Sequence, residues 1–588
     1  MNEAFSTLHA PLRIWRSSLA KLLAFAVILA TAAPVWAQPE ASKKGPTNPD
    51  VAAAKALVDD EKFYDAFGKL ADMMPNLSYD DPDRPLAQLL MGKVLFSLNL
   101  FQSALRSFDL VQVPQDHPLY SEKMRYYLRL QRAVPGDLAT IERLSDAPEG
   151  THRKEDLDEI RFLLGRYYYN VGDMPRAIEQ LTPVKITAGE IYLKSRHLLG
   201  TIYVKSAEKT AQKDTPEAMA QGKAQADMAL EAFKDVLRFE EQVGSPKYYP
   251  QYHDLASMSL GRLFYTIGQF ETAGRYYDRV REGSSTWLDS LFELGWTYFR
   301  LGRIDRVLGQ LHTLNSPYFE DRYYPEARVL ESLILFRTCR FSETLVSVQR
   351  FLRDYKPLKK ELDAQLAGQR SDAEFYDYLA ELAGKKAELS VQLRRIFNAA
   401  LSDKRLQRQF AAVALANDEM SGLEKLERNT SAPKAAAVLK DDMGRVRAVM
   451  IAEAGGLARA RLARVREELT EIIRQGLRIK YESLKARRGS ISDSVREDMA
   501  ETARQVSEQR EDDDEHIVWP FDGSYWKDEL GGYTYDTRSR CTAAQMPKGT
   551  VITAPVTGKA GAAMKKAGAT GADKKEEQEK ADDAGGKP

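Results

Sequence analysis

The stretch Leu260-Gly261-Arg262-Leu263-Phe264 opens the pattern that decides the fold. Its small residue, Gly261, is followed twelve positions later by a second small residue, Ala273, and four positions after that by Tyr277. Two antiparallel helices approach closely only where the facing side chains are small, so Gly261 and Ala273 are the expected contact points. Large residues such as Tyr277 then fill the space beside them. The pattern therefore predicts two short helices packed against each other.

Copies of this pattern recur along the chain. Their anchor positions are 54, 92, 127, 165, 200, 261, 295 and 332, which gives steps of 38, 35, 38, 35, 61, 34 and 37 residues. Gly268 and Gly302 stand where the turn inside a pair requires a positive φ. One pair cannot bury its apolar face alone, so neighbouring pairs must stack. We therefore predict an all-α solenoid over residues 51–357, interrupted after residue 205 by a polar insertion at 206–222.

These residues resemble the tetratricopeptide repeat family, most closely in the copies around Gly92, Gly165, Gly261 and Gly295. The resemblance covers about half of the chain. It implies a right-handed superhelix of helix pairs, in which the first helix of each pair lines a concave face that binds peptides or proteins. We therefore expect protein partners for this part of the chain.

The resemblance also implies which side chains point into the groove, because these follow the small residue by one and by four to five positions. They form a column of aromatic residues flanked by cations: Lys93, Phe96, Arg166, Tyr169, Arg262, Tyr265, Trp296, Phe299, Arg300, Phe336 and Arg337. Aromatic and arginine side chains are enriched at interaction hot spots, so one hypothesis is a groove for a partner segment with acidic and apolar anchors. The alternative is that the aromatic side chains pack between repeats and the cations form a solvated rim.

After Pro357 the pattern changes to a long helical module, residues 358–515. Apolar residues recur every three, four or seven positions, with a Pro-containing break at 431–433: Leu379, Leu382, Leu389, Leu393 and Ile396, then Leu462, Val465, Leu469, Ile472 and Ile479. This heptad-like spacing predicts an antiparallel helical hairpin, or helices that pair with another chain in a homo-oligomer. Residues 459–488 are mainly basic and residues 493–515 mainly acidic. These runs are either two solvated faces that attract each other or a basic helix that binds an anionic partner.

Six aromatic residues fall within residues 519–535. Such density predicts an ordered segment, and we expect a cap at 516–541 that covers an exposed end of the helical module. The alternative is a docking patch for a partner, formed by Trp519, Phe521, Tyr525 and Trp526. Cys541 follows directly and could pair with Cys339, but two distant cysteines leave this open. Residues 542–588 contain no aromatic residue and are predicted to be a disordered tail.

The first 37 residues have the pattern of a signal peptide, and residues 38–50 are expected to be a linker. Three cations precede an apolar run of 12 residues at 22–33, and Val35-Trp36-Ala37 fits the cleavage rule. The run is shorter than the roughly 20 residues that span a bilayer. We therefore predict export to the periplasm and no transmembrane segment in the mature chain, the alternative being an uncleaved N-terminal anchor.

Composition argues against several functional classes. Lys plus Arg and Asp plus Glu number 85 each, so net charge offers no drive toward nucleic acid. The chain has seven His and two Cys, and it has no phosphate-binding glycine loop, no His-Glu-x-x-His pattern and no nucleophile elbow. We expect no enzyme, no cofactor and no metal.

The prediction is therefore an exported scaffold or adaptor for other proteins in a bacterial envelope complex. The aromatic C-terminal segment on such a chain resembles periplasmic tetratricopeptide proteins of myxobacterial gliding-motility machinery, which implies a periplasmic part of an envelope-spanning machine. The alternatives are an assembly factor, and a chaperone or carrier for an exported protein or polymer.

Overall fold

The computed structural model describes residues 46–134, 138–213, 215–239, 249–319, 322–368, 370–384, 390–494, 525–535 and 539–541. Within these ranges the chain is helical and contains no β-strand, which confirms the predicted all-α class. The predicted signal peptide, most of the linker, the acidic run after residue 494 and the tail lie outside the described residues, as do Trp519 and Phe521.

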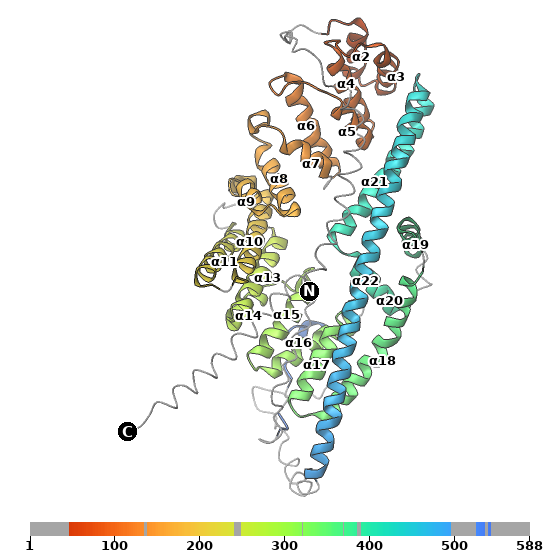
Figure 1. Cartoon of the computed structure of the whole chain (residues 1–588). Coiled ribbons are helices and arrows are strands. Elements are labelled where there is room, and N and C mark those ends of the chain that lie inside the picture. The colour runs from red at the N-terminus through yellow and green to blue at the C-terminus, as the bar shows by residue number, and fades with distance from the viewer. Residues whose placement is uncertain are drawn as a thin grey trace.

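Antiparallel helix pairs form a tetratricopeptide-like solenoid along the first part of the chain (Figure 1). The pairs are α2 (Pro49–Asp59) with α3 (Phe63–Met73), α4 (Arg84–Ser97) with α5 (Phe101–Asp109), α6 (Pro118–Ala133) with α7 (Leu138–Ser145), α8 (Leu157–Val171) with α9 (Met174–Leu181), α10 (Glu190–Ala211) with α11 (Pro216–Leu237), α13 (Pro250–Thr266) with α14 (Phe270–Tyr277), α15 (Trp287–Arg300) with α16 (Ile304–Leu314), and α17 (Pro325–Arg337) with α18 (Phe341–Leu366). Short 3-10 segments occur at η2 (Met74–Asn76), η3 (Glu149–Thr151), η4 (Ile186–Ala188), η5 (Pro317–Phe319) and η6 (Lys527–Glu529).

Small residues and tight turns explain why consecutive helices pack as antiparallel pairs. The turn between the two helices uses a residue with φ between 57° and 89° at Glu61, Asn99, Gly172, Gly268, Gly302 and Cys339. The ring of Tyr277 lies against Gly261, and a Cβ added there would lie 2.6 Å from the ring. Phe108 occupies the same place against Gly92, and Phe233 against Gly200. The predicted close approach at the small residue is therefore confirmed.

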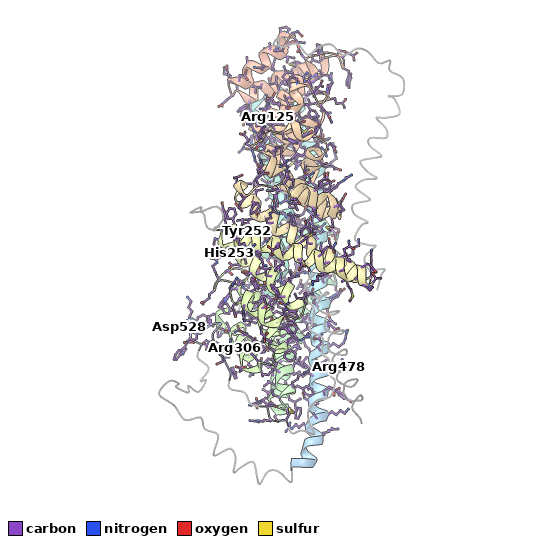
Figure 2. All side chains as sticks on the ribbon, turned by 90° about the vertical axis from the view of Figure 1, so that its left-hand side faces the viewer. Arg125, Tyr252, His253, Arg306, Arg478 and Asp528 are labelled. Carbon is purple, nitrogen blue, oxygen red and sulfur yellow. A yellow bond between two sulfur atoms is a disulfide. The ribbon has the colours of Figure 1, made fainter. Side chains whose placement is uncertain are left out.

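The polar insertion lengthens one pair and leaves the stack intact. Helices α10 and α11 have 22 residues each and take up most of residues 206–222 as helix. Helix α11 packs on α13, so the superhelix continues past this pair, and the expected interruption is wrong. In Figure 2 this pair, coloured yellow, extends sideways from the stacked helices.

The second part of the chain is a helical hairpin with three helices leading into it. Helix α18 continues through Pro357 to Leu366, so the boundary predicted at 357 falls inside a helix. It is followed by α19 (Asp372–Gly384), α20 (Val391–Leu401), α21 (Lys404–Asn429) and the 62-residue α22 (Pro433–Ser494). Helices α21 and α22 pack against each other, which confirms the hairpin. The first set of predicted seam residues does not lie on its first arm, since Leu379 and Leu382 belong to α19, and Leu393 and Ile396 to α20. The predicted seam residues of α22 are buried within the chain: Leu462, Val465, Leu469, Ile472 and Ile479.

The hairpin joins the two ends of the solenoid (Figure 1). At the start of the solenoid, Ser431 lies against Gly68, and Arg106 of α5 forms an ion pair of 2.7 Å with Asp442 of α22. Further along α22, Gly476 lies against Phe351 of α18. The solenoid is therefore closed into a loop, because α21 and α22 touch its first repeats while α22 also packs on its last pair.

A buried carboxyl at the contact of α17 with α22 predicts a pH dependence of stability. Burial raises the pKa of Glu326 to about 7, and the charge of Glu468 on α22 adds to the effect. Because the folded state holds the proton more tightly than the unfolded state, stability falls as pH rises from about 4.5 to about 7. The expected slope is about 1.4 kcal/mol for each pH unit.

Replacing Glu326 by Gln removes this titration. The variant should match the wild type near pH 5 and be more stable near pH 7.5, which urea unfolding at both pH values measures. Parallel pH profiles for the two proteins would contradict the assignment, because the neighbouring groups Glu468, Tyr323 and Tyr355 are unchanged in the variant.

Candidate partner-binding surfaces

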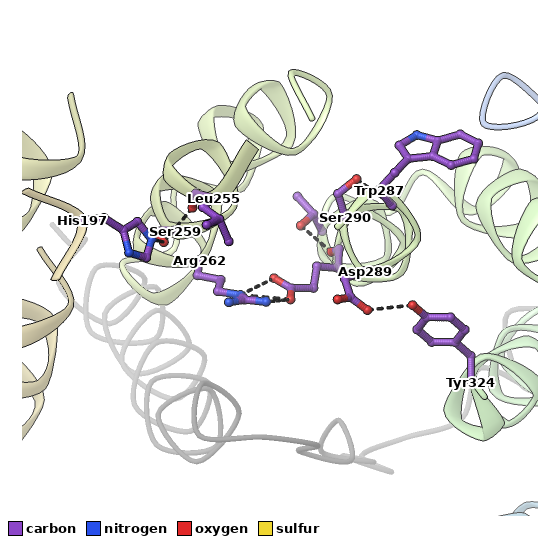
Figure 3. Close-up of polar contacts among 10 residues, drawn as sticks. His197, Leu255, Ser259, Arg262, Trp287, Asp289, Ser290 and Tyr324 are labelled. Carbon is purple, nitrogen blue, oxygen red and sulfur yellow. Dashed lines mark hydrogen bonds and ion pairs between the residues drawn. The ribbon is translucent and has the colours of Figure 1, made fainter. Parts of the chain in front are cut away.

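A ladder of polar contacts joins consecutive first helices along one face of the solenoid. Its steps are Lys93–Glu122 at 2.5 Å, Arg132–Glu159 at 2.5 Å, His197–Ser259 at 3.1 Å, Arg262–Glu293 at 2.5 Å and Tyr324–Asp289 at 2.7 Å. Figure 3 shows the last three steps, from α10 through α13 and α15 to α17. Arg408 of α21 shares a pocket with residues of α8 and α10, so this face turns toward the hairpin at these repeats.

The predicted groove residues divide into those that pack inside the solenoid and those that remain accessible. Lys93 and Arg262 are held in ion pairs of the ladder. Tyr265, Trp296 and Phe336 are buried, and their rings contact Phe270, Phe299 and Phe341, respectively. Phe96 packs against Phe101 and Tyr126. These aromatic side chains therefore serve the packing of helices, and the buried three offer no surface to a partner.

Two predicted cations remain exposed at the ends of first helices. The Arg300 guanidinium lies 4.6 Å from the ring centre of Phe270, and the Arg337 guanidinium lies 5.6 Å from that of Phe299. An aromatic ring behind a cation fixes its position without neutralising it. These cations are accessible to an acidic partner, and their role in binding stays a prediction.

Arg166 and Tyr169 line a pocket between the solenoid and the hairpin. The pocket measures about 290 Å³ and is lined by Phe162, Arg166, Tyr169 and Asn170 of α8, Lys194, His197 and Leu198 of α10, Tyr252 of α13 and Arg408 of α21. Burial lowers the pKa of His197 to about 4, so its ring is neutral at pH 7. The walls of this pocket therefore combine aromatic rings with positive charge.

The described part of the C-terminal aromatic segment, residues 525–535, lies on helix α16 of the solenoid. The backbone N–H of Gly531 donates to Thr313 Oγ1 at 2.9 Å, and Gln310 Nε2 donates to the Gly531 carbonyl at 3.0 Å. The N–H of Tyr535 donates to the Asp305 carbonyl at 3.0 Å. For these described residues the expected cap over an end of the module is wrong, because they cover α16 of the solenoid. The segment runs along α16. The backbone of Tyr533 lies directly against Gly309 of this helix, where any side chain would block the contact.

A disulfide joins this segment to the last repeat. Cys541 is bonded to Cys339, and their Cα atoms are 5.0 Å apart. Next to it, the N–H of Arg540 donates to the Thr338 carbonyl at 3.0 Å. The pairing that the sequence left open is therefore present in the structure.

Four aromatic side chains define a surface that we call the aromatic patch: Tyr318, Tyr525, Trp526 and Tyr535. Trp526 and Tyr318 are each 51% exposed. The ring of Tyr525 stacks on His312 with centroids 4.4 Å apart, and the Tyr318 hydroxyl donates to the Tyr525 carbonyl. Asp528 of the same segment lies on the side opposite α22, which carries Arg478 (Figure 2). The patch includes two of the four residues predicted for docking, Tyr525 and Trp526.

Sequence reasoning missed two residues of these surfaces. Tyr318 lies just after α16, outside any repeat position, and Arg408 is one of several cations on α21. No sequence pattern around either residue indicates a role in binding. Only the packing of distant segments places Tyr318 beside Tyr525 and Arg408 beside Arg166.

The described ranges hold no group of three or more His, Cys, Asp and Glu side chains arranged for a metal ion. In the same ranges, no helix is both long and apolar enough to cross a bilayer.

No family model and no curated protein matches the chain. Among solved structures, it is similar to a tetratricopeptide repeat protein from Parabacteroides merdae ATCC 43184, with 11% identity over 52% of this chain and 91% of that chain. The TM-score is 0.22, so this likeness carries no argument. The class of the protein follows from its own helix pairs: it is an all-α, tetratricopeptide-like solenoid closed by a helical hairpin.

Proposed function

We propose that this chain is an exported scaffold that holds protein partners in a bacterial envelope complex, with the aromatic patch as a docking surface. Export is supported by the signal-peptide pattern of residues 1–37. A role in gliding-motility machinery is supported by the resemblance of the C-terminal aromatic segment. The closed loop of helices supports a scaffold, since it holds its surfaces in a fixed arrangement.

The observation that carries the docking role is the position of Trp526. Its side chain is half exposed, yet its backbone N–H donates to the Tyr533 hydroxyl oxygen at 2.8 Å, and its carbonyl accepts from the same hydroxyl at 3.1 Å. These bonds hold the backbone of Trp526 in place, so binding has to order only its side chain, which lowers the entropic cost. Tryptophan is also the residue most typical of binding hot spots. The patch therefore has the chemistry and the rigidity of a protein-docking site.

Replacing Trp526 by Ala in the full chain should remove partner proteins from a crosslinked pull-down in the native envelope. A hot-spot tryptophan contributes about 2 kcal/mol or more, which corresponds to about 30-fold weaker binding. The melting temperature should stay near that of the wild type, because the side chain is half exposed.

Tyr79→Ala is the matched control for this experiment, since Tyr79 is an exposed aromatic residue at the other end of the solenoid. It should keep every partner. The docking role of the patch is rejected if the Trp526 variant captures the same partners as the control.

A further inference from the structure

None of the ladder contacts described above joins α8 to α10. Lys93 directly follows Gly92 and pairs with Glu122 of the next first helix, and Arg262 directly follows Gly261 and pairs with Glu293. Arg166 holds the same repeat position, directly after Gly165. In place of a glutamate, the next first helix, α10, presents Lys194 and His197 to this pocket.

A further cation faces Arg166 from outside the repeats. Arg408 of α21 lines the same pocket. Burial lowers the pKa of Arg166, and the positive charge of Arg408 lowers it further. Among the residues that the structure describes, no carboxylate forms an ion pair with either guanidinium. The partly buried Arg166 guanidinium is unfavourable without a counter-ion, since buried charges are normally paired, and the exposed Arg408 adds like-charge repulsion.

Glu190, whose partners Lys194 and Tyr252 both line the pocket, is already engaged. Glu190 pairs with Lys194 at 3.0 Å and accepts a hydrogen bond from the Tyr252 hydroxyl at 2.7 Å. Lys404, one turn before Arg408 on α21, adds positive charge near His197 and helps keep its ring neutral. The pocket therefore carries an excess of positive charge that the described part of the chain does not neutralise.

Aromatic rings form the remaining walls. The Arg166 guanidinium lies 5.7 Å from the ring centre of Phe162, and Lys205 lies 4.2 Å from that of Tyr169. These rings fix the cations and provide a flat apolar surface. A volume of about 290 Å³ accommodates a small molecule or one or two side chains, and excludes a packed helix.

We infer that this pocket binds an oxyanion group, a carboxylate or a phosphate, which takes the place of the missing glutamate and is held between Arg166 of the solenoid and Arg408 of the hairpin. The site is separate from the aromatic patch, and it does not depend on the docking role of Trp526. The group belongs either to a free small anion or to an acidic peptide. Because one wall is α8 and the other is α21, bound oxyanion also fastens the hairpin to the middle of the solenoid.

Calorimetric titration and thermal unfolding of the full chain test this site. Citrate serves as the free anion, and a hexaglutamate peptide serves as the acidic peptide. Each probe is compared with KCl at equal ionic strength. The wild type should bind at least one probe and melt at a higher temperature in its presence. Arg166→Gln and Arg408→Gln should each weaken binding at least about tenfold, because each removes a charge-assisted contact. The apo form of the Arg166 variant should be no less stable than the wild type, since a like-charge contact disappears.

Arg238→Gln is the matched control, because Arg238 is an exposed arginine directly after α11 that pairs with Glu231 and does not line the pocket. It should bind the probes as the wild type does. Binding of citrate alone identifies a free anion, and binding of the peptide alone identifies an acidic segment. No binding of either probe overturns the site, as does unchanged binding by both pocket variants. Arg408 is exposed, so its variant keeps the experiment decisive if the Arg166 variant does not fold.

Discussion

Replacing Gly261 by Ala should lower the free energy of unfolding by about 1–3 kcal/mol, the usual cost of overpacking a core. The new methyl group would lie 2.6 Å from the ring of Tyr277, which is buried and cannot swing aside. Helix α14 must therefore move away from α13. Urea unfolding followed by circular dichroism measures the loss.

Gly295→Ala is the matched control at the same position of the next repeat. There the nearest atom to an added Cβ is Cβ of Gln310, at 4.0 Å, so the methyl group fits. Alanine is also a better helix former than glycine, by up to about 1 kcal/mol. The control should therefore be neutral or stabilising. Equal losses in the two variants would show that close approach at the small residue is not what joins the helices.

Replacing Glu419 by Ala should cost about 2–4 kcal/mol and loosen the start of helix α5. This carboxylate of α21 is 3% exposed and accepts hydrogen bonds from the N–H groups of Gln102 and Ser103, both at 2.9 Å, and from Ser103 Oγ at 2.8 Å. The residue before α5 is Leu100, which has no side-chain oxygen to cap the helix. Glu419 therefore caps α5 from a distant part of the chain, and without it buried donors stay unsatisfied.

Two measurements check this result. Urea unfolding gives the loss of stability, and hydrogen exchange should become faster at the amides of Gln102 and Ser103. Glu427→Ala is the control, since Glu427 forms a partly exposed ion pair with Lys440 inside the hairpin and should cost less than about 1 kcal/mol. Unchanged exchange at the start of α5 in the Glu419 variant would contradict the cap.

The sequence predicted those parts of the fold that depend on neighbouring residues. Gly261 and Tyr277 are close enough in the chain for one helix pair to contain both, so their spacing was sufficient to predict their contact. Gly268 and Gly302 marked turns that require a positive φ, and the structure has them at 79° and 72°. The insertion was predicted as an interruption because its composition is polar, yet a polar sequence also suits two long, exposed helices.

The candidate surfaces were predicted less well. The repeat position of Trp296 and Phe336 correctly placed them on first helices, but burial depends on what packs over them. Arg262 forms an ion pair with Glu293 of the next first helix, whereas Arg300 and Arg337 stand at the ends of their helices and are exposed. Tyr525 and Trp526 were recognised from the density of aromatic residues, whereas their place beside Tyr318 was not.

The sequence by itself determined the helix pairs, their turns and the seam of the hairpin, because each of these is a periodic pattern read within one or two helices. Only the tertiary structure decided that the hairpin closes the solenoid, that the C-terminal segment lies on α16, and that Arg166 faces Arg408 where other repeats place a glutamate. Those contacts join residues far apart in the chain. The free energy of these contacts comes from surfaces that exist only after the helices have packed. The spacing of residues within one or two helices therefore does not predict them.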